Sequence, residues 1–133
     1  MQVNISLPWP PTVNSYYART KRGVFISKAG RTFRDAVDSA LNEQMCLGLA
    51  LTERLSVQVI LYPPDRRTRD LDNYMKALLD ACTKSRLWGD DEQIDELAIM
   101  RGSLVPGGKT LMQITEHHGM IMPDDPGIWD MLE

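Results

Sequence analysis

Two short segments of the chain alternate hydrophobic and polar residues with the period of a half-buried β-strand. In residues 3–7 every second residue is apolar, and the prolines within residues 8–11 prevent further regular pairing. Residues 55–62 alternate in a similar way and end at Pro63 and Pro64. The pattern therefore predicts one strand near the N-terminus and a second strand in the middle of the chain.

Two other segments carry apolar residues at the three- and four-residue steps of an amphipathic helix. The first runs from about 29 to 47; it follows Ser27, which can cap a helix, and stops before Gly48. The second spans roughly residues 71–84. Each predicted helix directly follows one of the two predicted strands or the loop after it, as expected when helices pack on a sheet.

Turn signals divide the rest of the chain. Residues 14–26 predict a polar loop with a small hairpin, and segments 96–104 and 110–116 flank a Pro-Gly-Gly hairpin signal at 106–108. The order strand, helix, strand, helix, strand, strand predicts an α/β or α+β domain. We expect a mixed sheet with both helices packed on it, parallel across the helical crossovers and antiparallel at the last hairpin.

The composition fits one globular domain. The chain has 133 residues, of which 43% are hydrophobic and 25% charged, with no apolar run long enough for a membrane span and no secretory signal, so we expect a cytoplasmic protein. We expect the domain to cover residues 1–118 and the acidic tail, 119–133, to be flexible. The net charge of −3 disfavours a polyanion ligand, but without the four acids of the tail it becomes +1. The body of the chain is mildly basic.

Three aspartates could form an acidic site. Asp70 and Asp72 lie where the second helix is predicted to begin, and Asp91 lies in the turn after it. Two carboxylates about 4 Å apart repel by roughly 4 kcal/mol at an effective dielectric near 20, so three of them are stable mainly around a cation. Oxygen ligands without Cys or His favour Mg²⁺ or Mn²⁺, which can clamp a phosphodiester and activate water. Lys76, on the same helix face as Asp72, could then stabilise the pentavalent phosphorane or the leaving group.

Each of these residues also has a purely structural explanation. Asp70 suits a helix N-cap, and Asp72 suits the positive end of the helix dipole. Asp90 and Asp91 follow a glycine in a common type of turn, and Lys76 alone could be a solvated helix residue. The combination D-x-D-N-x-x-K with a second acid pair favours a metal site, but spacing alone leaves both explanations open.

Basic and aromatic residues near these acids suggest a nucleic acid ligand. The cluster Arg66, Arg67 and Arg69 could draw a phosphate backbone past the carboxylates. Lys21 and Arg22 in the predicted hairpin could extend this path, as could Arg31 and Arg34, although a solvated helix face is the commoner role for the last two. Tyr16, Tyr17 and Phe25 could stack on unpaired bases, although packing is the commoner role for such residues.

With these residues assembled, the sequence resembles the RusA family of Holliday junction resolvases over about residues 3–116. The shared motifs are LPWPP at 7–11 with Asn14 and Tyr17, PDRRxRDLDN at 64–73, Lys76 with Asp80, and LWxDD at 87–91. The DLDN segment is the most specific of them, and ordered motifs of this length rarely coincide by chance. A basic chain is expected of a junction resolvase, and this chain departs from that pattern.

The resemblance implies a homodimer that makes paired symmetric nicks in a four-way DNA junction during recombination and repair, in bacteria or their phages. It implies that Asp70, Asp72 and Asp91 bind Mg²⁺, with Mn²⁺ as a possible substitute, and that Lys76 assists. Asn73 is expected to orient the site by hydrogen bonds. The residues expected to contact DNA are Arg66, Arg67, Arg69, Asn73, Lys21, Arg22, Asn14 and Tyr17.

Two other classes of protein compete with this hypothesis. A branched-DNA-binding protein that does not cleave would use the acids only as caps, but a pure binding surface gains nothing from carboxylates beside phosphates. A phosphotransfer receiver would also have an acidic pocket and a lysine. Its acids should lie near the first strand, whereas here they follow the second.

Overall fold

The structure is a computed structural model, and it describes residues 1–119. The acidic tail expected at 119–133 lies, after Gly119, outside the described residues. The strands are β1 (Gln2–Leu7), β2 (Tyr17–Thr20), β3 (Gly23–Ile26), β4 (Leu55–Tyr62), β5 (Ile94–Arg101) and β6 (Lys109–Glu116). The helices are α1 (Val13–Tyr16), α2 (Lys28–Glu43) and α3 (Met75–Lys84), with two 3₁₀ turns, η1 (Leu71–Tyr74) and η2 (Asp91–Gln93).

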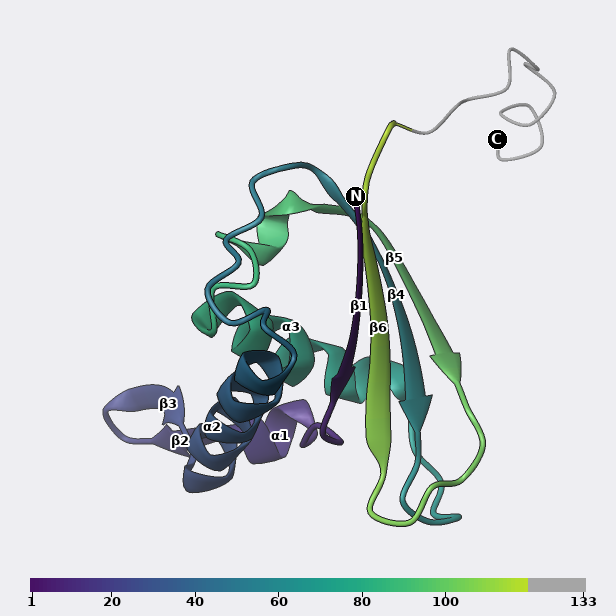
Figure 1. The fold of residues 1–133 in the computed structure, drawn as a ribbon. Coiled ribbons are helices and arrows are strands. Elements are labelled where there is room, and N and C mark those ends of the chain that lie inside the picture. Colours follow the sequence, from purple (N-terminus) through teal and green to yellow (C-terminus); the bar gives the residue numbers. More distant parts are fainter. Residues whose placement is uncertain (120–133) are drawn as a thin grey trace, which may run out of the picture.

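A mixed sheet of four strands, in the order β1-β6-β4-β5, carries α2 and α3 on one face (Figure 1). β4 and β5 are parallel, and β6 is antiparallel to both β1 and β4. The predicted α+β class, the mixed sheet and the parallel pair across the second helix are therefore confirmed. The hairpin β2–β3 forms a separate two-stranded sheet, which confirms the small hairpin predicted within residues 14–26.

The predicted pairing of the last two strands with each other is wrong. The turn at residues 105–108 forms, with the Gly108 N–H donating to the Val105 carbonyl at 2.7 Å, but β4 lies between β5 and β6. β6 buries Thr110, Met112 and Ile114, as a central strand does, whereas β5 is largely exposed and forms an edge. Turn residues specify only the local reversal, and burial decides which strands become neighbours.

The core lies between the sheet and the two helices. Alternate residues of β4, from Leu55 to Leu61, are buried and face the apolar sides of the helices. On α2 the buried residues include Phe33, Val37 and Leu41. Each fully buried side chain of this size contributes roughly 1.5–3 kcal/mol relative to exposure. No helix among residues 1–119 has the length and apolar character that crossing a bilayer requires.

The helix boundaries differ from the predicted ones. α2 begins after Ser27, which caps it as expected, but it ends at Glu43 instead of 47. The side-chain amide of Gln44 bonds the backbone of Ser6, donating to its carbonyl at 2.7 Å and accepting from its N–H at 2.8 Å, so it covers the free edge of β1. Met45 then takes a positive φ of 62° and is 90% exposed.

The predicted helix 71–84 is in fact η1 followed by α3, and the sequence pattern missed the short helix α1.

Candidate active site and nucleic-acid interface

The segment that leads into η1 is held by a carboxylate and two arginines. Asp65 accepts a hydrogen bond from the Arg67 N–H at 2.9 Å and pairs with Arg69 at 2.8 Å. The Arg69 guanidinium, together with that N–H, holds the pKa of Asp65 below its usual value. Arg101, at the end of β5, donates to the Arg69 carbonyl at 2.6 Å. The backbone immediately before Asp70 is therefore fixed from two sides.

The carboxylates of Asp70 and Asp72 are exposed at the start of η1. Asp70 occupies the N-cap position that the sequence predicted, but its side chain makes no capping hydrogen bond. Among residues 1–119, neither carboxylate takes part in an ion pair. Asp70 therefore does not act as a helix cap through its side chain, and the carboxylates of Asp70 and Asp72 are both available to an external ligand.

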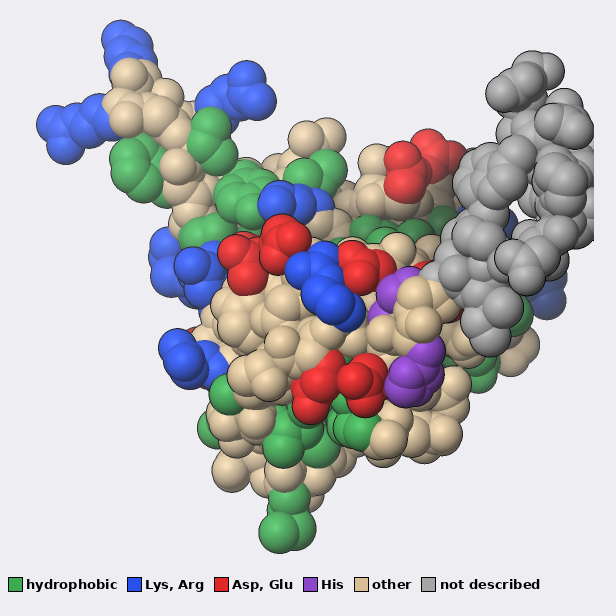
Figure 2. All heavy atoms as spheres, turned by 90° about the horizontal axis from the view of Figure 1, so that it is seen from above, with side chains coloured by type: hydrophobic (Ala, Val, Ile, Leu, Met, Phe, Trp, Pro, Cys, Tyr) green, Lys and Arg blue, Asp and Glu red, His purple; other side chains and the backbone are tan. Residues whose placement is uncertain are grey.

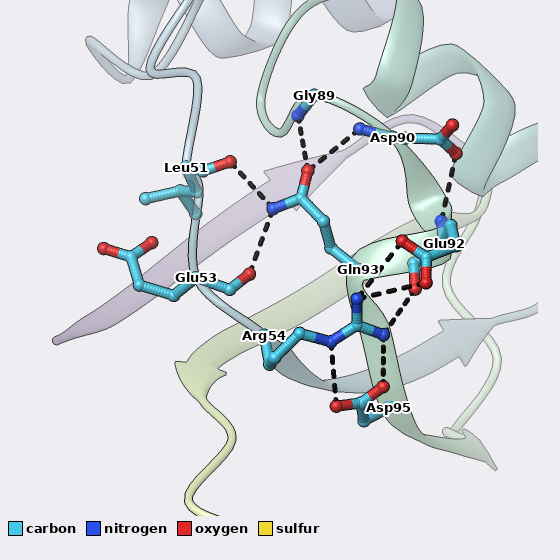
Figure 3. A network of polar contacts seen from close by, with 8 residues as sticks. All are labelled: Leu51, Glu53, Arg54, Gly89, Asp90, Glu92, Gln93 and Asp95. Carbon is cyan, nitrogen blue, oxygen red and sulfur yellow. Dashed lines mark hydrogen bonds and ion pairs between the residues drawn. The ribbon is translucent and has the colours of Figure 1, made fainter.

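The second acidic turn, η2, is held by side-chain hydrogen bonds and ion pairs (Figure 3). The Asp90 side chain accepts from the Glu92 N–H at 3.0 Å, and the Gln93 side-chain oxygen accepts from the N–H groups of Gly89 and Asp90. The same amide of Gln93 donates to the carbonyls of Leu51 and Glu53 at 2.9 and 3.0 Å. Asp90 is thus a structural cap, as one of the two sequence explanations proposed.

Arg54 adds a second anchor to this turn, from the segment just before β4 (Figure 3). Its guanidinium pairs with Glu92 at 3.1 Å, donates to the Glu92 carbonyl at 2.7 Å, and also binds the Asp95 carboxylate. Contacts from Arg54 and Gln93 therefore hold both ends of η2 against residues 51–54. Asp91 lies between these fixed points.

Asp91 faces a mixed set of charges. Burial raises the pKa of Asp91 above its usual value, and the hydrogen bond with Asp90 raises it further. The positive charge of Lys76 acts in the opposite direction and lowers this pKa. The backbone hydrogen bond from Glu92 lowers the pKa of Asp90, and Lys76 acts in the same direction. Asp80, one turn after Lys76 on α3, also contributes to the field at Asp91. Lys76, Asp80 and Asp90 therefore all act on the ionisation of Asp91.

The three predicted metal ligands fit Mg²⁺ in their chemistry but are not gathered into one set. All three are carboxylates, the hard oxygen donors that Mg²⁺ prefers. In the part of the chain that the structure describes, however, no three Asp, Glu, His or Cys residues lie close enough together to hold a metal ion. Asp70 and Asp72 lie at the start of η1 and Asp91 lies in η2, so within one chain, over residues 1–119, the three carboxylates do not converge on one ion.

A network that the sequence patterns missed ties α3 to the N-terminal part of the chain. The Tyr16 hydroxyl donates to Asp80, Arg34 donates to that hydroxyl at 2.7 Å, and Arg34 pairs with Asp80 at 2.8 Å. Burial disfavours ionisation of Asp80, but the hydrogen bonds from Tyr16 and Arg34 outweigh it, so its pKa lies below the usual value. Arg34 is therefore a structural residue. The long sequence separation hid this pairing, although Asp80 already belonged to a family motif.

Gly30 makes this network possible. A side-chain Cβ at Gly30 would lie 2.4 Å from the carbonyl oxygen of Tyr16, so only glycine lets α2 approach the end of α1 so closely. Ser27 accepts from the Gly30 N–H at 2.9 Å and donates to the Tyr16 carbonyl at 3.0 Å. The start of α2 is thereby fixed to Tyr16, and Arg34 reaches Asp80 from there.

The arginine cluster divides into exposed and structural members. The side chain of Arg67 is 84% exposed, and Arg66 is exposed as well. Arg69 is only 14% exposed, because it pairs with Asp65 and its guanidinium carbon lies 5.6 Å from the centre of the Trp9 ring. Arg66 and Arg67 are therefore exposed enough to reach phosphates, although Arg67 also makes a long ion pair with Asp65 at 3.8 Å, whereas Arg69 mainly holds the loop.

A groove of about 860 Å³ lies beside this cluster. Its walls are residues 8–12, the first turns of α2, and residues 67–69 with Tyr74. Lys28, Arg67 and Arg69 contribute its charge, and no Asp or Glu lines it. The groove therefore suits the phosphate backbone of a nucleic acid strand.

The remaining predicted DNA contacts differ in exposure. Lys21 and Arg22 are exposed at the turn between β2 and β3, Asn14 is exposed on α1, and Asn73 is exposed on η1. Tyr17 is half-buried, packs against the core and meets the ring of Tyr16 edge-on, with ring centroids 4.8 Å apart. Tyr17 is therefore mainly a packing residue in this structure.

Exposed carboxylates beside a cationic groove, on a small α+β scaffold, are features of a protein that processes nucleic acid. A sequence model of the family described as Endodeoxyribonuclease RusA matches residues 8–114. The chain belongs to this family, so the resemblance found in its motifs is confirmed. The matched region contains both acidic turns, Lys76 and the arginine cluster.

Three relatives show how far the similarity extends. The crossover junction endodeoxyribonuclease RusA of Shigella sonnei (strain Ss046) is 38% identical over 114 residues, which is 85% of this chain and 93% of the relative. That of Enterobacteria phage HK97 is 40% identical over 110 residues, 83% of this chain and 91% of the relative. That of Escherichia coli (strain K12) is 37% identical over 114 residues, with the same coverage as the first. The relatives come from both bacteria and phages.

Proposed function

We propose that this protein is a structure-specific endodeoxyribonuclease that resolves four-way DNA junctions by paired symmetric nicks, in recombination and repair. The observation that carries the proposal is family membership over residues 8–114, a region that keeps Asp70, Asp72, Asp91 and Lys76. The relatives named above are crossover junction endodeoxyribonucleases. The exposed state of Asp70 and Asp72 supports a role toward an external ligand.

The proposed cofactor is Mg²⁺, with Mn²⁺ as a substitute, held by Asp70, Asp72 and Asp91. When bound, such an ion polarises the phosphodiester and lowers the pKa of water. The residues of the chain provide the rest. Arg66, Arg67 and the cationic groove attract and align the backbone, and Lys76 adds a positive charge that favours the ionised form of Asp91.

The proposal includes a homodimer and a cytoplasmic location in a bacterial cell. Two opposed strands must be cut in one junction, and each chain offers one pair of acidic turns. A symmetric dimer supplies two equivalent sites for this purpose. Junction DNA in bacteria lies in the cytoplasm, where phage DNA is also processed.

One observation favours a second function, namely binding of branched DNA without cleavage. No three carboxylates are gathered among residues 1–119, as a ready metal site would require. Against this alternative, exposed carboxylates beside a phosphate path weaken binding. Asp70 and Asp72 would then oppose the only function of the protein.

Cleavage assays on synthetic DNA separate the two functions. Purified protein is incubated with a labelled four-way junction and with a matched linear duplex, each with Mg²⁺ and with EDTA. Symmetric nicks in the junction alone, and only with Mg²⁺, are the expected result. A gel shift of the junction without cleavage, at low salt and with Mn²⁺ also tried, would instead establish the binding protein.

A further inference from the structure

The hairpin of β2 and β3, residues 17–26, forms an arm that projects from the body (Figures 1 and 2). Its tip is the turn at Lys21 and Arg22, followed by Gly23 with a φ of +125°. A side chain added at Gly23 would meet no atom within 4 Å, so the body does not cover the tip. The arm is thus free to contact another molecule along its outer half.

The charge of the arm suits a polyanion. Arg19, Lys21 and Arg22 are exposed on it, and it contains no acid. The same imbalance extends through residues 1–34, which hold six of the 15 Lys and Arg residues, whereas all 18 Asp and Glu residues follow them. Lys28, just beyond the base of the arm, also lines the cationic groove. A strand lying in that groove would therefore pass close to the base of the arm.

Phe25 is the aromatic residue that this arm leaves uncovered. Tyr16 is fully buried and Tyr17 half-buried, but Phe25 is 52% exposed. In the hairpin Phe25 pairs with Ala18, while Tyr17 pairs with Ile26. Paired side chains share one face, so Phe25 lies opposite the face through which Tyr17 and Ile26 pack on the core. The small side chain of Ala18 leaves the ring open to solvent.

We propose that the arm recognises the branch point of a DNA junction, with Phe25 stacked on a base that opens there and with Arg19, Lys21 and Arg22 on the flanking phosphates. This inference rests on the proposed function, because it takes branched DNA as the ligand. Stacking on an aromatic residue needs a base released from its pair, and a pair at the branch point, where the helices are interrupted, opens at lower cost than a pair inside a continuous duplex. Phosphate contacts act on both kinds of DNA equally. Phe25 should therefore determine selectivity for the junction, and the cations should determine overall affinity.

The test compares Phe25→Ala with Val24→Ala in the full-length protein. Val24 is adjacent, equally exposed at 55%, and on the opposite face of the hairpin, so it is a matched control. Binding to a four-way junction and to a matched duplex is measured in EDTA, with 2-aminopurine placed at the branch point. Phe25→Ala should weaken junction binding about tenfold or more, leave duplex binding unchanged, and abolish the fluorescence change caused by the unmodified protein. Val24→Ala should alter none of these.

Junction binding by Phe25→Ala equal to that of the unmodified protein would overturn the inference. A shift of Phe25→Ala from dimer to monomer in sedimentation would also overturn it and would assign the ring to an interface between copies. The double variant Lys21→Ala with Arg22→Ala should weaken junction and duplex binding alike and make the salt dependence shallower by about two units. If the unmodified protein neither binds nor cuts the junction, the proposed function itself fails.

Discussion

The two turns that carry the predicted metal ligands are built in opposite ways. η2 is fixed by the capping box of Asp90 and Gln93 and by the ion pairs of Arg54, so Asp91 has a defined position (Figure 3). η1 is also anchored, by the buried Tyr74 and by the backbone contact before Asp70, but its two carboxylates stay exposed without a capping bond. The comparison therefore separates a half of the site whose acids are held by other side chains from a half whose carboxylates are left for an external ligand.

The largest expected effect concerns the half with the unpartnered carboxylates. Asp70→Asn should lower junction cleavage at least about 100-fold, because it removes a charged oxygen ligand. Binding to the junction should stay intact or become tighter, because one repulsion of phosphate disappears. Cleavage assays and gel shifts on the same preparation check this. Loss of binding together with cleavage would contradict the role given to Asp70.

The next effect concerns the half whose acids are held by other side chains. Gln93→Ala removes hydrogen bonds on both sides of η2 and should lower the free energy of unfolding by about 2 kcal/mol. Cleavage should fall about tenfold or more, because Asp91 loses its fixed position. Glu92→Ala is the control on the same turn. It removes an exposed ion pair, which typically contributes less than about 1 kcal/mol. Equal effects of the two variants would show that Gln93 does not hold the turn.

α3 connects the two turns, and its anchor at Asp80 should respond to pH. The folded-state pKa of Asp80 is depressed, so its ionised form contributes stability above the unfolded pKa, about 3.9, and this contribution is lost as the pH falls through the folded pKa. Asp80→Asn should therefore cost about 1–3 kcal/mol at pH 7, and the deficit should shrink below about pH 4. Urea unfolding at several pH values measures it. A deficit independent of pH would mean that the charge of Asp80 is not what stabilises the fold.

The smallest effect tests the difference between the caps directly. Asp90→Ala should lower the free energy of unfolding by about 1 kcal/mol, because it removes a capping hydrogen bond. Asp70→Ala should change it by less than about 0.5 kcal/mol, because Asp70 makes no such bond. Chemical denaturation of both variants gives the two values. Similar losses in the two variants would remove the distinction between the turns.

The sequence predicted those parts of the fold that depend on local periodicity. Strands β1 and β4, both main helices and the cap at Ser27 follow from residues close together in the chain. The place of β6 between β1 and β4 does not, because it depends on burial across the whole sheet. Gln44 likewise ends α2 by binding a strand 38 residues earlier, a contact that no local pattern encodes.

The candidate site shows the same limit. The motifs found Asp70, Asp72, Asp91 and Lys76, and they also found the exposed Arg66 and Arg67. They did not separate Arg69, which Trp9 and Asp65 hold, from its more exposed neighbours. They also gave no sign of how Tyr16 and Arg34 anchor Asp80, because these contacts span 64 and 46 residues. Spacing identifies which residue types are present, and packing decides which of them remain free.

Cleavage of a supercoiled plasmid that extrudes a cruciform tests the central claim most directly. Coordinated cuts in two opposed strands of one junction convert such a plasmid to linear DNA, whereas single cuts give nicked circles. We expect linear product with Mg²⁺ and none with EDTA or with the Asp70→Asn variant. Nicked circles alone would contradict paired cleavage by a dimer, and an unchanged plasmid that is nevertheless bound would contradict the assignment as a nuclease.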